Sequence, residues 1–254
     1  MTILDEIVAH KRDEVSRKKA LVQTFELKAL PPTRDFQSAL KGSGISLIAE
    51  IKRSSPSKKV MRGDCDPARL ARIYGRCGAA AISVLTDERF FCGRDEFVAV
   101  AKNETDVPVL RKEFIIDAYQ IYESRVLGAD AILLIASILD EAQIISFLSI
   151  AAEVDLSCLV ETHTKEEVGR VLKSGARIIG INNRDLTTLQ VDLGTSFRLR
   201  RLIPFDIVTV SESGIQTRED IVRLEEAGFD AALVGESLVR SPDVGRKVRE
   251  FLGR

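Results

Sequence analysis

A carboxylate and an ammonium stand close together at the end of one short apolar run. The run at residues 47–51, LIAEI, has the composition of a strand buried on both faces, so a charge there is costly. Glu50 and Lys52 lie two residues apart, so strand alternation puts them on the same side. The serine-proline segment that follows cannot continue a strand, and its hydroxyls suit an anion. The pattern predicts a site for a phosphorylated small molecule, with a structural ion pair at a barrel mouth as the alternative.

Similar polar residues end other apolar runs of the chain. They are Lys112 in VLRKEF, Glu161 in LVETH, Asn182 and Arg184 in GINNRDL, and Glu212 and Ser213 in VSESG. Each alone is more often a solvated rim charge, but together they predict cations and carboxylates around one mouth. A lysine near other cations in a partly desolvated site would have a lowered pKa, suited to proton transfer. Asn182 is alternatively a turn residue with a positive φ, and His163 lies past its strand end, which makes it a weaker candidate base.

Small residues follow the last two apolar runs and predict a phosphate site. Ser213 and Gly214 follow one run, and Gly235 and Glu236 follow the next, where a short helix is expected to begin. Backbone N–H groups at such positions can approach an anion closely. With the hydroxyl of Ser55 from the first loop, they form the predicted phosphate-binding set.

The elements that position these residues repeat along the chain. Eight apolar runs alternate with amphipathic segments at a spacing of roughly 20 to 33 residues, the length of one βα unit. Helical patterns are clearest over residues 67–77, 118–127, 141–152, 165–173 and 218–226. Four helix-to-strand connections, CGAAAISV, LGADAILL, SGARIIGI and AGFDAALV, place glycine where a left-handed cap is needed. We therefore predict an α/β protein, a (β/α)8 TIM barrel, in one domain over residues 1–254.

Residues 1–45 precede the first strand and predict a helical extension. Apolar residues recur at helical spacing from Ile3, and a second short helix is expected between Asp35 and Lys41.

Composition excludes several classes of function. The chain has 37 lysines and arginines against 38 acidic residues, so no overall field favours nucleic acid or an anionic membrane. No apolar run approaches a membrane span, and the N-terminal residues contain acids, so we expect a cytoplasmic protein without a membrane partner. Four scattered cysteines and two histidines predict neither a disulfide framework nor a metal site. The oligomeric state stays open, and a monomer is compatible with the sequence.

These motifs resemble one known family, indole-3-glycerol phosphate synthase, the barrel enzyme of tryptophan biosynthesis. The resemblance rests on IAEIKRSSPSK, VLRKEF, LVETH, GINNRDL, SESGI and VGESL, in this order, and with the N-terminal extension it covers nearly the whole chain. It implies a carboxy-lyase that closes, decarboxylates and dehydrates 1-(2-carboxyphenylamino)-1-deoxyribulose 5-phosphate without a cofactor.

The resemblance also implies roles for individual residues. Lys112 would be the general acid, and Glu161 would be the base for dehydration. Lys52 and Arg184 would attract the benzoate carboxylate, and Lys52 would also help proton transfer. Glu50 and Asn182 would orient the lysines and the sugar hydroxyls. The phosphate would be held by Ser55, Gly214, Gly235 and Glu236, with Ser213 beside the substrate. Phe114, with Leu133 or Leu134, would line the aromatic pocket.

Two alternatives remain at this point. A phosphoribosylanthranilate isomerase would bind phosphate at the same end of a barrel, but it is recognised by a cysteine and an aspartate. No cysteine ends the first strand of this chain, and both lysines would lack a function. A non-catalytic sensor of a phosphorylated metabolite would need neither Lys112 nor Glu161.

Overall fold

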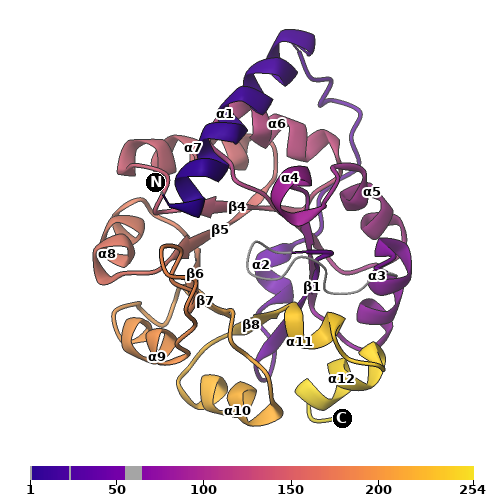
Figure 1. The fold of residues 1–254 in the computed structure, drawn as a ribbon, viewed down its shortest axis with the longest axis vertical. Coiled ribbons are helices and arrows are strands. Elements are labelled where there is room, and N and C mark those ends of the chain that lie inside the picture. The colour runs from indigo at the N-terminus through magenta and orange to yellow at the C-terminus, as the bar shows by residue number, and fades with distance from the viewer. Residues whose placement is uncertain (1, 23, 55–64) are drawn as a thin grey trace.

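The computed structural model describes residues 2–22, 24–54 and 65–254. Eight parallel strands close into a barrel in chain order, with β1 paired to both β2 and β8 (Figure 1). The strands are β1 Ser46–Ile51, β2 Ala81–Leu85, β3 Val109–Lys112, β4 Ala131–Ile135, β5 Ser157–Thr162, β6 Ile178–Asn182, β7 Val208–Glu212 and β8 Ala231–Val234. The predicted (β/α)8 barrel is confirmed, and each predicted apolar run contains one strand.

Helices surround the barrel, and one lies inside its outline (Figure 1). The predicted helices are α1 Ile3–Leu21, α2 Phe36–Ala39, α3 Pro67–Arg76, α6 Ala118–Val126, α7 Glu141–Glu153, α8 Lys165–Lys173, α10 Arg218–Glu226 and α11 Glu236–Val239. Those not singled out from the sequence are α4 Glu88–Phe91, α5 Glu96–Asn103, α9 Gly194–Arg200 and α12 Val244–Phe251. None of these four exceeds eight residues, which leaves little room for a helical period.

The four predicted glycine turns have the predicted geometry. Gly78, Gly128, Gly175 and Gly228 have φ values of 97°, 89°, 81° and 83°, which residues with a Cβ rarely adopt. Each follows a helix and turns the chain back toward the next strand, so the same local chemistry sets four of the connections around the ring.

Two apolar cores position the strands. One fills the space between the barrel and its helices, and the other fills the barrel interior. Interior side chains include Ile48, Leu110, Leu133, Leu159, Ile178, Val208, Val210 and Leu233. Phe36 and Leu40 of the α2 segment join this interior core, and α2 is seen within the barrel outline in Figure 1. Because side chains alternate, the next inward position beyond these residues lies at the carboxyl end of each strand.

The N-terminal extension is helical, as predicted. A capping box at Thr2 starts α1, and ion pairs of Lys18 join the helix to Asp95 beside α5 and to Glu123 in α6. Within the residues that the structure describes, no helix combines the length and the apolar character required to cross a bilayer.

Candidate active site

A cavity of about 810 Å³ opens at the carboxyl ends of the strands. Its size suits a small metabolite, and its position is the one that barrel enzymes use. Every predicted site residue that the structure describes lines it: Glu50, Lys52, Lys112, Phe114, Leu133, Glu161, Asn182, Arg184, Ser213, Gly214, Gly235 and Glu236. Ser55 lies outside the described residues. The fold thus gathers side chains from β1 and from β3 to β8, together with the loops that follow them.

An ammonium held between two carboxylates forms the centre of the cavity. Lys112 Nζ lies 2.9 Å from Glu161 Oε2 and 2.7 Å from Glu212 Oε2. All three side chains are buried or nearly so, with 11%, 4% and 2% exposed, respectively. Glu212 received no role from the sequence, although its spacing from the inward-facing Val208 and Val210 indicates that it faces the interior.

Burial and pairing set the charge states of this group. Burial alone would lower the pKa of Lys112, but the Glu161 and Glu212 carboxylates outweigh it and raise that pKa. Burial alone would raise the pKa of Glu161, but Lys112 and His163 outweigh it and lower that pKa. Burial, with repulsion from Glu161, raises the pKa of Glu212 to about 7. The lowered lysine pKa predicted from the sequence is therefore wrong for Lys112, because its nearest charges are carboxylates rather than cations.

A second ion pair lies in the same cavity. Lys52 Nζ is 2.7 Å from Glu50 Oε1, and both side chains point into the cavity, as alternation along β1 predicted. A Cβ at Gly235 would lie 2.4 Å from Glu50 Oε1, and a Cβ at Gly180 would lie 2.3 Å from Glu212 Oε1. Both glycines therefore make room for a buried carboxylate. Gly180 was not predicted to matter, although a glycine inside a strand often indicates such a close approach.

Gly180→Ala is expected to displace the Glu212 carboxylate and lower kcat by about 10- to 100-fold, because small misplacements of a catalytic group are costly. The matched control is Gly169→Ala in α8, where the added Cβ meets nothing within 4 Å. That control is expected to stabilise the fold by about 0.5–1 kcal/mol with unchanged kinetics. Steady-state kinetics and thermal unfolding check both variants, and equal kcat values for them would contradict the steric argument.

The β6 loop holds Asn182 and Arg184 against the mouth. Asn182 ends β6 in register with Glu212, and its Oδ1 accepts a hydrogen bond of 3.0 Å from the Arg184 N–H. The alternative of a positive φ at Asn182 is wrong, because this residue has strand geometry. Its neighbour Asn183 is 2% exposed, and its side chain donates to the Glu212 and Ser213 carbonyls at 2.9 and 3.0 Å. Asn183 therefore joins the β6 loop to the end of β7.

Small residues form the far end of the cavity. Ser213 and Gly214 follow β7 with φ values of 66° and 84°, so the chain turns sharply beside the mouth. The short helix α11 follows Gly235, and the side chain of its first residue, Glu236, pairs with Arg240 at 3.2 Å. Because the Glu236 carboxylate pairs with Arg240, an anion at this end would bind the backbone N–H groups of the segment rather than the Glu236 side chain.

Aromatic and aliphatic side chains form the opposite end. Phe114 and Leu133 line the cavity, whereas Leu134 belongs to the outer core, so only the first of the two leucines is correctly placed. Phe91 also lines the cavity, with its ring centroid 6.0 Å from that of Phe114. Phe91 was missed because α4 is a single turn without a recognisable period.

His163 lies behind the cavity rather than in it. Its Nε2 is 3.4 Å from Glu161 Oε1, and its Nδ1 is 3.4 Å from Glu167 Oε2. Burial alone would lower the pKa of His163, but the two carboxylates outweigh it and raise the pKa to about 10. A protonated imidazolium at this position keeps Glu161 ionised from the side opposite Lys112.

This raised pKa predicts a pH dependence of stability. The folded-state pKa exceeds the ordinary value of 6.5, so the stabilisation is complete below about pH 6.5 and is lost as the pH rises through about 10. The free energy of unfolding should fall more steeply over that range in the wild type than in His163→Gln, by up to about 1.4 kcal/mol per pH unit. Urea unfolding at several pH values measures both slopes, and parallel slopes would contradict the assignment.

Fold and site together define the class of protein. A buried ammonium between carboxylates, in a cavity at the carboxyl end of a (β/α)8 barrel, is the arrangement of an enzyme that works by acid–base chemistry. Comparison with known proteins specifies the class further. The family model for indole-3-glycerol phosphate synthase matches residues 4–251.

Curated relatives agree with this match over their full length. An indole-3-glycerol phosphate synthase of Dehalococcoides mccartyi (strain CBDB1) is 48% identical, with 98% of this chain and 100% of that protein aligned. One from Legionella pneumophila (strain Paris) is 45% identical, with 99% and 98% aligned. The chain belongs to the indole-3-glycerol phosphate synthase family, and the family predicted from the sequence is confirmed.

Solved structures add support for the fold alone. The thiamine phosphate pyrophosphorylase from Pyrococcus furiosus matches with a TM-score of 0.61 at 15% identity, covering 86% of this chain and 96% of that one. A 3-hexulose-6-phosphate synthase matches with a TM-score of 0.62 at 17% identity, covering 82% and 99%. At such identities the likeness extends to the barrel and not to its chemistry.

Proposed function

We propose that the chain converts 1-(2-carboxyphenylamino)-1-deoxyribulose 5-phosphate into indole-3-glycerol phosphate, carbon dioxide and water, with Lys112 as acid and Glu161 as base. The observation that carries this proposal is the Lys112 ammonium between Glu161 and Glu212 in the cavity. Both reacting partners belong to one substrate molecule, so holding it in a folded pose supplies much of the catalysis.

The first steps need an acid. As the ring carbon attacks the ketone carbon, a carbon–carbon bond forms and the ketone oxygen takes a proton from Lys112. The raised pKa of Lys112 keeps it protonated, which is the form a proton donor needs. Loss of carbon dioxide from the ring then restores aromaticity, because the electron pair of the broken bond returns to the ring.

The last step needs a base. Loss of water breaks the carbon–oxygen bond as the hydroxyl takes a proton from Lys52 and the neighbouring carbon gives up a proton, and Glu161, an ionised carboxylate 2.9 Å from Lys112, accepts that proton. Glu212 keeps the lysine in place from the other side, and its pKa of about 7 allows it to exchange a proton near neutral pH. Lys112 and Glu161 are therefore a poised acid and base of opposite charge.

The rest of the cavity binds the substrate. The Lys52 and Arg184 cations attract the benzoate carboxylate, while Glu50 orients Lys52 through their ion pair and Asn182 faces the sugar hydroxyls. The phosphate occupies the end formed by Gly214, Gly235 and the backbone of Glu236, with Ser213 beside it. Ser55, outside the described residues, stays the predicted hydroxyl donor. The aromatic ring lies against Phe114 and Leu133.

We also propose that the chain acts as one domain, with residues 1–45 as its extension. Because a sugar phosphate carrying a further carboxylate does not cross a bilayer, the enzyme is expected to work in the compartment that makes its substrate, and we propose the cytoplasm as that compartment. The substrate is a small molecule, and no nucleic acid takes part.

The test adds the substrate to the purified chain, without metal or cofactor, and follows indole fluorescence together with release of carbon dioxide. One equivalent of each product per substrate is expected. A folded protein that releases neither would overturn the proposal, and isomerisation without decarboxylation would indicate the isomerase class instead.

A further inference from the structure

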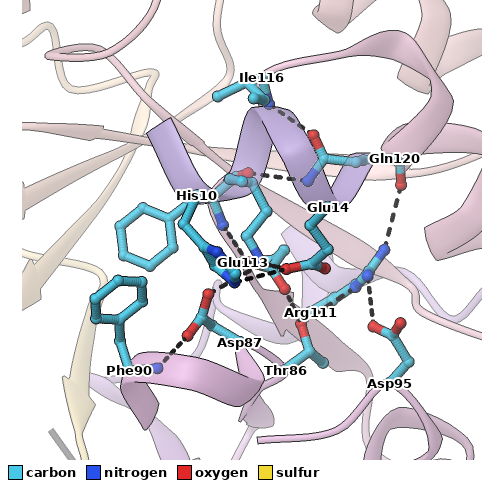
Figure 2. A network of polar contacts seen from close by, with 12 residues as sticks. His10, Glu14, Thr86, Asp87, Phe90, Asp95, Arg111, Glu113, Ile116 and Gln120 are labelled. Atoms are coloured by element: carbon cyan, nitrogen blue, oxygen red, sulfur yellow. Dashed lines mark hydrogen bonds and ion pairs between the residues drawn. The ribbon is translucent and has the colours of Figure 1, made fainter. Parts of the chain in front are cut away.

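A buried lysine on the N-terminal helix lies outside the reaction described above. Lys11 in α1 is 1% exposed, and its Nζ lies 3.0 Å from Asp87 Oδ2, 3.1 Å from Glu113 Oε1 and 2.9 Å from Glu14 Oε2. Figure 2 shows Glu14, which lies on this helix, together with Asp87 and Glu113. A buried ammonium is costly unless it is paired, so this position requires a compensating gain.

Asp87, the first of these carboxylates, stabilises a helix that forms part of the cavity wall. Asp87 is fully buried and caps α4, where its Oδ1 accepts a hydrogen bond of 2.7 Å from the Phe90 N–H (Figure 2). Helix α4 is a single turn and ends at Phe91, whose ring lines the cavity. A turn this short depends on its cap, so the position of Phe91 depends on Asp87.

Glu113, the second carboxylate, fixes the backbone of the other part of the same wall. Glu113 follows catalytic Lys112 in sequence and is 3% exposed. Its Oε1 accepts a hydrogen bond of 2.7 Å from the Phe114 N–H, and its Oε2 accepts one of 2.8 Å from Thr86 Oγ1. Glu113 therefore fixes the backbone that carries Phe114 and links it to the segment that carries Asp87.

We propose that Lys11 is a positioning residue for substrate, which holds the aromatic wall of Phe91 and Phe114 in place by binding Asp87 and Glu113 together. The proposal rests on the function proposed above, since the wall is where the aromatic ring of the substrate lies. It gives the N-terminal extension a defined role in ring recognition.

Electrostatics agree with this arrangement. Burial alone would lower the pKa of Lys11, but Glu113 and Asp87 outweigh it and raise that pKa. Without the ammonium, two carboxylates on adjacent loops would face one another in a buried site and would separate or bind protons. Separation displaces the backbone of one of the two phenylalanines, and a protonated carboxyl accepts more weakly from the Phe90 or Phe114 N–H that it holds.

The test compares Lys11→Met with the wild type in steady-state kinetics. Loss of ring packing should raise KM by about 10- to 200-fold, the range for losing part of an apolar contact, with kcat within about threefold. The matched control is Lys19→Met on the same helix, because Lys19 pairs with Asp117 at 2.8 Å while 50% exposed. That control is expected to retain both constants.

A rise in KM with little change in kcat distinguishes displacement of the Phe91 and Phe114 wall from general damage to the fold. Because Glu113 is next to Lys112, disturbance of β3 as a whole would lower kcat. Unchanged KM, or a fall in kcat alone, would overturn the proposal. An inactive wild type would overturn the proposed function instead, so the two failures are distinguishable.

A second variant covers the case in which Lys11→Met does not fold. Asp87→Ala removes the cap of α4 but leaves Lys11 paired with Glu113 and Glu14. The same selective rise in KM is expected, and an unchanged KM in a folded Asp87→Ala protein would overturn the proposal.

Discussion

Lys112→Met is expected to lower kcat/KM by about 10²- to 10⁴-fold, the usual contribution of a positioned general acid. Methionine retains the length of the side chain but cannot protonate the ketone oxygen, so formation of carbon dioxide and of indole-3-glycerol phosphate should slow together. In single-turnover experiments, a label in the substrate carboxylate measures carbon dioxide, and indole fluorescence measures the other product. The fold should persist, because Glu212, with its pKa raised to about 7, can take up a proton when its partner is removed.

Two controls define the origin of that loss. Lys112→Arg keeps a cation in the cavity but is far weaker as a proton donor, so it should also be inactive if proton transfer matters more than charge. Lys173→Met, on the exposed end of α8, should match the wild type. Activity in Lys112→Arg near that of the wild type would limit the role of Lys112 to electrostatic attraction.

Glu161→Gln is expected to lower kcat by about 10²- to 10⁴-fold through a different step. The amide retains the shape of the carboxylate but cannot remove the proton lost on dehydration. Ring closure and decarboxylation precede that step, so a single turnover should release carbon dioxide from the labelled carboxylate without forming indole-3-glycerol phosphate. Mass spectrometry of the quenched reaction should then find the decarboxylated, hydrated intermediate.

The comparison with Lys112→Met makes this result specific. Loss of both products in Glu161→Gln would place Glu161 before decarboxylation and contradict the assigned order. Glu153→Gln on the exposed surface of α7 is the matched control, since it removes one carboxylate that does not line the cavity. It should behave as the wild type in every measurement.

Much of this architecture could be predicted from local patterns. Strand alternation is a property of neighbouring residues, so it correctly placed Glu50 with Lys52 and directed both into the cavity. Glycine turns such as Gly78 are equally local, because a positive φ depends on the absence of a Cβ. Some short elements escaped prediction, and Phe91 was missed with α4 because a single turn has no period.

The sequence by itself thus determined the barrel, its carboxyl-end residues and the family, since these follow from local periodicity and from contiguous motifs. Only the tertiary structure decided the charge state of Lys112, whose partners Glu161 and Glu212 are 49 and 100 residues away along the chain. It likewise decided the burial of Lys11 against Asp87 and Glu113. The physical reason is that Coulomb energies and desolvation depend on distances in space and on exclusion of water, which arise only when distant strands and the N-terminal helix pack together.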